Sequence, residues 1–181
     1  MSMLSTLASR AALVVYLSVA VVVAVVASTI AFQAAPDQAY RTLNITEDNV
    51  AIQGYDTVAY FTDNKAIKGK GEFQHDWRDA LWQFASATNR DLFAANPDRY
   101  SPQFGGYCAL GIAAGEVSDV DPKAFTIVDG KLYLNKGMKF RKKWREAPQA
   151  YIGNADYNWK NNRRGMRNVL NCDQWPECGF L

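Results

Sequence analysis

The sequence has almost no net charge and no repeated pattern. It contains 20 Lys and Arg residues against 18 Asp and Glu residues, which leaves a formal charge of +2 at pH 7. So small an excess produces no strong field, and charge alone therefore does not predict nucleic acid as a partner. Internal repeats and low-complexity tracts are lacking as well, so we do not expect a repeat architecture.

Cysteine is scarce and odd in number. With three cysteines in the chain, one is left over from any intramolecular pairing. The expected disulfide joins Cys172 to Cys178, because a short tail with little core of its own benefits from a covalent closure outside the cytoplasm. So small a loop adds only about 2 kcal/mol. A two-thiolate metal clip and free thiols are the alternatives, and the expected disulfide leaves Cys108 alone.

Apolar residues, in contrast, are plentiful. Of 181 residues, 49% are hydrophobic and 13% are aromatic, which is ample for one compact core but short for two once the N-terminal stretch is set aside. We therefore expect one small domain. The expected organisation is a membrane anchor or signal peptide over residues 1–35, a linker over 36–49, the domain over 50–160 and a C-terminal extension over 161–181.

One long hydrophobic run lies near the N-terminus. From Ala11 to Phe32 there is no charged residue, and about 20 residues at about 1.5 Å each cross a hydrocarbon core of about 30 Å. A cleavable signal peptide usually has a shorter apolar region, although the segment 29–31 would make an acceptable processing site. We expect a retained single-pass anchor. Arg10 favours the N-terminus inside and the domain outside, which in a bacterium means the inner membrane and the periplasm.

The domain is expected to open with two short strands. Gly54 and Asp56 interrupt the apolar residues between 50 and 61, and a polar segment over 62–71 follows them. Glycine and aspartate favour turns through backbone freedom and local hydrogen bonding. This pattern predicts a strand, a turn and a second strand.

The next strand carries the chain's single histidine. Phe73, His75 and Trp77 alternate with polar residues, and this period of two puts all three side chains on one face. We therefore expect His75 to point inward, on the same face as two aromatic rings. A further strand is predicted over Leu81–Ala85.

A short helix and a glycine loop lead to Cys108. Ser86 or Thr88 can cap the helix, which is expected to stop near Pro97. The loop that follows contains the glycine pair 105–106, which allows a close turn and holds Cys108 at a constrained position. The pair is not a phosphate-binding loop, because no lysine follows it at the spacing of that motif.

The clearest local signal is the segment AFTIVDGKLYLN. Asp129 and Gly130 suit a two-residue hairpin turn in which both residues have positive φ. Such a turn places four large apolar side chains on one face, which we assign to the core. The predicted pairs are Val128 with Lys131, Ile127 with Leu132 and Phe125 with Leu134.

Two helices and a basic tail complete the chain. Phe140, Trp144 and Ala147 recur at helical spacing, and Pro148 suits the first turn of a second helix. The lysines and arginines between them are interpreted as a solvated face. That second helix carries Tyr151, Ile152, Ala155 and Trp159. The basic cluster beyond it is either a docking tail for a partner or for acidic lipid headgroups, or a simple extension; it consists of Arg163, Arg164 and Arg167.

Four segments of the chain resemble the YHS-domain family as it appears in exported bacterial proteins. They are AIQGYDTVAYF, EFQHDWRDALWQFASATNRDLFAANPDRYSPQFGGYCA, DPKAFTIVDGKLYLN and NADYNW, which span roughly residues 50–160. The resemblance implies a small α+β domain with antiparallel hairpins and short helices, here preceded by one transmembrane helix. It also implies a relation to modules beside metal-transport and metal-resistance proteins, for which copper or heavy-metal binding is the usual proposal.

The chain departs from the metal-associated members of this family in its cysteines. Those members carry several near the fold's knuckle, whereas this chain has Cys108 alone there and Ala85-Ser86 where another cysteine is expected. Thr57 also stands in place of an expected proline. Structural zinc takes four protein ligands, so the departure weakens a zinc site.

A soft-metal site remains, in which Cys108 as thiolate and His75 as neutral imidazole bind copper. Met138 or Tyr107 is the possible third ligand, and thiolate and thioether ligands select Cu(I). The resemblance, and not the spacing, implies that Cys108 and His75 lie close together. The alternatives are a core histidine and a small buried cysteine.

Two other classes of function compete with metal binding. A Cys and His pair can act as nucleophile and base, but nothing beyond the amides of the 105–106 pair predicts the orienting group and oxyanion donors of an enzyme. The sequence therefore favours a non-enzymatic binding module. The other class is an accessory or structural subunit of a membrane complex, without a metal site. A pocket that joins Cys108 and His75 favours the metal, and a continuous apolar patch favours the subunit.

Overall fold

The computed structural model describes residues 42–162 and 167–168, all within a unit that begins at Tyr40. This part of the chain is a small α+β domain with two antiparallel hairpins and short helices, as the sequence predicts. The expected anchor, Ala11 to Phe32, lies outside the described residues. Within them, no helix has the length and apolar character needed to cross a bilayer.

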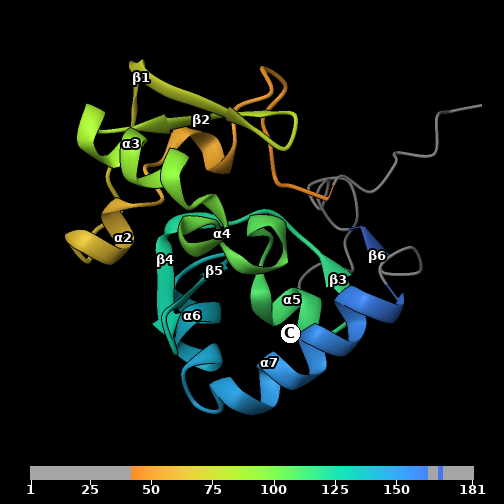
Figure 1. Cartoon of the computed structure of the whole chain (residues 1–181). Helices are drawn as coiled ribbons and strands as arrows, with labels where there is room; N and C mark the ends of the chain where they lie inside the picture. Colours follow the sequence, from red (N-terminus) through yellow and green to blue (C-terminus); the bar gives the residue numbers. More distant parts are fainter. Residues whose placement is uncertain (1–41, 163–166, 169–181) are drawn as a thin grey trace, which may run out of the picture. The chain divides into compact units, whose positions relative to one another are not determined.

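Figure 1 shows the helices and strands of this part of the chain. β1 pairs with β2 and β4 with β5, both antiparallel, and β3 pairs with β6 in parallel. In chain order the elements are η1 (Ile52–Gly54), α2 (Ala59–Thr62), β1 (Lys70–Trp77), β2 (Ala80–Phe84), α3 (Ala87–Ala95), α4 (Pro97–Tyr100), η2 (Gln103–Gly106), α5 (Ala109–Ala113), β3 (Glu116–Val117), β4 (Asp121–Val128), β5 (Lys131–Asn135), α6 (Met138–Trp144), α7 (Pro148–Tyr157), η3 (Asn158–Asn162) and β6 (Arg167–Asn168).

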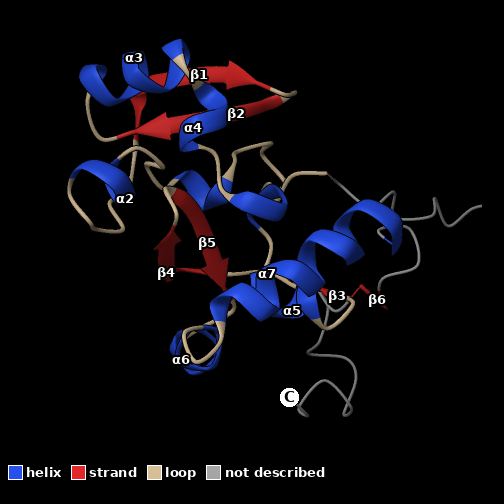
Figure 2. Cartoon of the chain, turned by 60° about the horizontal axis from the view of Figure 1, so that its bottom comes forward, coloured by secondary structure: helices blue, strands red, loops and turns tan. Residues whose placement is uncertain are grey.

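The first hairpin confirms the period of two around His75. Phe73, His75 and Trp77 are half-buried, while the residues between them are exposed. Helix α3 lies along this hairpin in both views (Figures 1 and 2), and its buried Phe93 contacts the aromatic face. Ser86 caps α3, since its Oγ accepts a hydrogen bond of 3.2 Å from the backbone N–H of Asn89.

The prediction of two strands over residues 50–61 was wrong. Apart from isolated bridges at Val50, Ala51 and Tyr55, this segment forms η1 and the single helical turn α2. The reason is Asp56, whose Oδ1 accepts hydrogen bonds from the backbone N–H groups of Val58, at 2.9 Å, and Ala59, at 3.1 Å. A carboxylate that satisfies the free N–H groups at a helix start favours the helix over an extended chain.

Asp56 also joins two parts of the domain. Its second oxygen, Oδ2, accepts hydrogen bonds from the backbone N–H of Ala85, at 2.8 Å, and from Nδ2 of Asn89, at 2.7 Å. The carboxylate is fully buried, so these four bonds replace the water that it loses. The start of α2 is therefore fastened to the junction of β2 and α3.

The second hairpin confirms the predicted turn and register. Asp129 and Gly130 have φ of 49° and 71°, and the three predicted pairs form. However, β5 buries both of its faces, whereas the sequence predicted one. The ring of Tyr133, on the opposite face from Leu132 and Leu134, lies 5.9 Å from that of Phe104 and 5.2 Å from that of Trp144.

The folded domain begins earlier than the predicted boundary at Val50. Leu43 and Asn44 are buried. The backbone N–H of Asn44 donates to the carbonyl oxygen of Gly105, at 2.8 Å, and its own carbonyl accepts from Ile52 N–H, at 3.1 Å. The predicted linker over 36–49 therefore extends too far toward the C-terminus. Hydrogen bonds between the backbones of distant segments produce no periodic pattern in the sequence, so this boundary could not be predicted.

The two C-terminal helices follow the predicted pattern except at Ala147 and at Trp159, which lies beyond α7 in η3. Trp144 is fully buried in α6, and α7 begins at Pro148 as predicted. Ala147 is exposed and lies between the helices with an extended φ of −150°. A residue before proline is disfavoured in the helical conformation, which explains why the helical spacing ends before this alanine.

Candidate functional site

Cys108 is held at the start of α5 by the turn before it. In η2, Gly105 and Gly106 have φ of 62° and 79°, a conformation that glycine adopts without strain. The backbone N–H of Cys108 then donates to the carbonyl oxygen of Ser118, at 3.1 Å. The cysteine is a free thiol and is 1% exposed, so its constrained position agrees with the prediction.

The thiol belongs to a buried polar network with the end of β5. Its Sγ accepts a hydrogen bond of 3.3 Å from Lys136 N–H and lies 3.9 Å from Oδ1 of Asn135, to which the S–H donates. The same oxygen accepts from Leu110 N–H, at 3.4 Å. Asn135 is fully buried, and its Nδ2 has no partner within the described residues. The network fastens α5 to β5.

His75 lies in other surroundings. Its ring faces Phe93 of α3, with 6.1 Å between the ring centroids. No hydrogen bond, ion pair or ring contact joins His75 to Cys108 in the described part of the chain. That the two residues bind the same metal ion therefore stays a prediction.

The two possible third ligands differ in exposure. Met138 begins α6 and is 57% exposed. Tyr107 is buried, and its hydroxyl donates to the carbonyl oxygen of Leu43, at 3.2 Å. Within residues 42–162 and 167–168, no group of three or more His, Cys, Asp or Glu side chains is placed to hold a metal ion.

The predicted tail sites lie mostly outside the described residues. This applies to the disulfide of Cys172 with Cys178 and to Arg163 and Arg164. Arg167 is described by its backbone alone, as the first residue of β6, where it pairs with Glu116 of β3.

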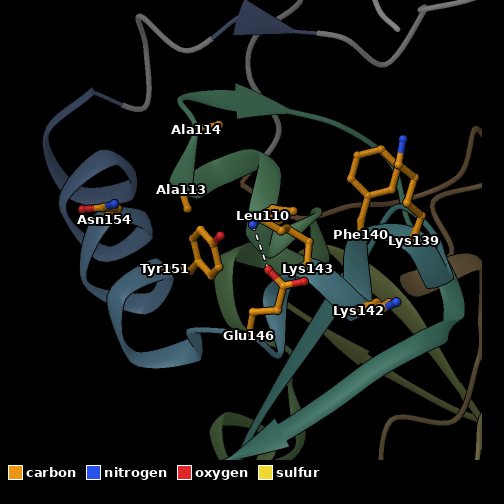
Figure 3. A pocket seen from close by; sticks show the side chains of 10 residues that line it. All are labelled: Leu110, Ala113, Ala114, Lys139, Phe140, Lys142, Lys143, Glu146, Tyr151 and Asn154. Atoms are coloured by element: carbon orange, nitrogen blue, oxygen red, sulfur yellow. Dashed lines mark hydrogen bonds and ion pairs between the residues drawn. The ribbon is translucent and has the colours of Figure 1, made fainter. Parts of the chain in front are cut away.

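A pocket of about 500 Å³ lies between α5, α6 and α7 (Figure 3). This volume falls within the range of about 300–1,000 Å³ that is usual for small-molecule sites. Ten residues line it: Leu110, Ala113 and Ala114 at α5, Lys139, Phe140, Lys142 and Lys143 on α6, Glu146 in the following turn, and Tyr151 and Asn154 on α7.

The walls of this pocket are largely apolar. Figure 3 shows the rings of Tyr151 and Phe140 on opposite sides of Leu110. Leu110 is buried, and the two rings are half-buried. Ala113 and Ala114 add little side-chain volume, which leaves the space between the helices open. An apolar ligand would thus find contacts on three sides.

The polar lining is mainly cationic. Lys143 pairs with Glu146, with 2.8 Å between Nζ and Oε2. This hydrogen bond raises the pKa of Lys143 and lowers the pKa of Glu146, so both side chains stay charged at neutral pH. Lys139 and Lys142 make no ion pair or side-chain hydrogen bond with a described residue. Among the described residues the lining therefore carries three lysines against one glutamate, and its net charge is positive.

Sequence reasoning missed this pocket. The lysines of MKFRKKW were interpreted as a solvated face, and they are indeed exposed. The sequence pattern of α6 does not indicate that α5 and α7 pack against each other beside these lysines. The only available signal was the small pair Ala113 and Ala114, close in sequence to Cys108. Comparisons with family models, with curated proteins and with solved structures find no match to this chain.

Proposed function

We propose that this chain is a non-enzymatic binding domain of the YHS type, carried on the outer side of a membrane by its N-terminal hydrophobic segment. The four sequence segments over residues 50–160 support the family assignment, and the uncharged run from Ala11 to Phe32 supports the anchor. The α+β fold of the described residues is compatible with this family.

The observation that carries the proposal is the pocket between α5, α6 and α7. It is concave, has a volume of about 500 Å³ and presents apolar walls with a few charged groups. Ligand sites in proteins commonly combine these features. The domain therefore acts by holding a small molecule against Leu110, Phe140 and Tyr151.

Filling the pocket is expected to remove its ligand. The full chain, extracted with its membrane segment, is analysed by native mass spectrometry for co-purifying small molecules. Ala113→Trp places a large ring among the lining residues and is expected to abolish the bound species. Ala94→Trp makes the same change at an exposed position of α3 and is expected to leave it. Equal ligand content in the wild type and both variants would contradict the proposal, provided that circular dichroism shows both variants folded.

A second candidate is copper binding through Cys108. The observation in its favour is a free thiol at a constrained position, since thiolate is the form that selects Cu(I). Elemental analysis of the same membrane preparation is expected to find a stoichiometric metal that is lost in both Cys108→Ser and His75→Ala. A wild-type protein without metal, together with a defined set of co-purifying proteins, would instead favour the accessory subunit.

A further inference from the structure

The pocket combines two properties that point to one kind of ligand. Its interior is apolar, with Leu110 between the rings of Phe140 and Tyr151 (Figure 3). Apolar surface of this kind binds hydrocarbon by removing it from water. A small, fully polar ligand would leave these walls without a partner.

The net charge of the residues that line the pocket is positive. Among the described residues, Glu146 is the only acidic one in the lining; it pairs with Lys143, and the charge of Lys142 also lowers its pKa. Lys139 and Lys142 remain, one turn apart on α6, and make no ion pair with a described residue. The neighbouring residues Arg141 and Arg145 add further positive charge. An anionic group is therefore favoured beside the apolar interior.

We infer that the pocket takes a single-chain fatty carboxylate, with the hydrocarbon chain against Leu110, Phe140 and Tyr151 and the carboxylate at Lys139 and Lys142. The inference rests on the proposed binding function and adds the chemical class of the ligand. A cationic amphiphile would be repelled by the two lysines. A neutral one would use the walls but leave the net positive charge of the lining without a counter-charge.

The test compares two photoreactive probes that differ only in their head group. The full chain is reconstituted in phosphatidylcholine vesicles, which carry no net charge. It is labelled with a diazirine-bearing fatty acid or with the matching fatty alcohol. Mass spectrometry of the digested protein then measures labelling of the peptides that contain Leu110, Phe140 and Tyr151. The fatty acid is expected to label these peptides more strongly than the alcohol.

Removing the two lysine charges is expected to affect the acid alone. The double variant Lys139→Gln with Lys142→Gln keeps the side chains long and polar, so that the fold is preserved. It is expected to lower pocket labelling by the acid at least about fivefold and to leave labelling by the alcohol unchanged. Lys65→Gln makes a single charge change at an exposed position that does not line the pocket, and it is expected to change neither.

The outcomes separate the ligand class from the binding function. Equal labelling by acid and alcohol in the wild type, or an unchanged acid signal in the double variant, would overturn the carboxylate while the pocket would still bind apolar molecules. Absence of label from the pocket peptides with both probes would overturn the inference. If the Ala113→Trp experiment showed that another small molecule binds in the pocket, the proposed function would survive this failure.

Discussion

Asp56→Ala is expected to destabilise the domain by about 4 kcal/mol, enough to unfold most of the protein under mild denaturing conditions. The carboxylate is buried and accepts four hydrogen bonds. Its removal leaves the N–H groups of Val58, Ala59 and Ala85 and the amide of Asn89 without their acceptor. Each buried donor left in this way costs about 1–3 kcal/mol, and water entering the space offsets part of the sum.

Two companion variants test whether the cause is the carboxylate itself. Asp56→Asn keeps the shape but turns one acceptor into a donor, which would then face another donor, so an intermediate loss is expected. Asp48→Ala removes an exposed aspartate and is expected to change the free energy of unfolding by less than about 0.5 kcal/mol. Urea unfolding followed by tryptophan fluorescence measures all three. A midpoint for Asp56→Ala equal to that of the wild type would show that the four contacts do not hold the fold together.

Gly105→Ala is expected to be the second most damaging change. Gly105 has a φ of 62°, and a Cβ built there would clash with the backbone carbonyl oxygen of Thr42. A backbone neighbour cannot rotate away as a side chain can. The segment around Thr42 must therefore move, which breaks the hydrogen bond from Asn44 N–H to Gly105. We expect a loss of about 3 kcal/mol or more in the free energy of unfolding.

Gly115 provides a matched control for this prediction. Its φ of 79° is equally unfavourable for alanine, but nothing lies within 4 Å of a Cβ built there. Gly115→Ala therefore carries only the conformational cost of about 1 kcal/mol. Thermal unfolding of both variants separates the two contributions. Equal melting temperatures would mean that the contact with Thr42 is not the source of the effect.

Local features of the fold were predictable because their causes lie within a few residues. The turn at Asp129 and Gly130 needs only the two residues that tolerate positive φ, and the cap at Ser86 needs only an oxygen at a helix start. The alternation around His75 predicted its inward face for the same reason. Each of these signals is complete within one stretch of sequence.

Features that depend on distant residues were not predictable. Asp56 stands in a segment whose residue types are typical of a turn. Its role as a helix cap depends on α2, and its second oxygen binds Asn89, 33 positions away. The hydrogen-bond partner of Cys108 is Asn135, 27 positions away, so nothing in the sequence predicts their contact. The lysines of α6 likewise have the pattern of an exposed face, and only the approach of α5 and α7 makes a pocket beside them.

The attachment of Leu43 and Asn44 to the η2 turn determines where this chain can be shortened. The side chain of Asn44 donates to the carbonyl oxygen of Gly106, at 3.3 Å, and to Oδ1 of Asp119, at 2.9 Å, in addition to its backbone bonds. A soluble version that begins at Val50 would lose all of these contacts and open the turn that precedes Cys108. A version that begins at Thr42 keeps them and is expected to be the more stable of the two in urea unfolding.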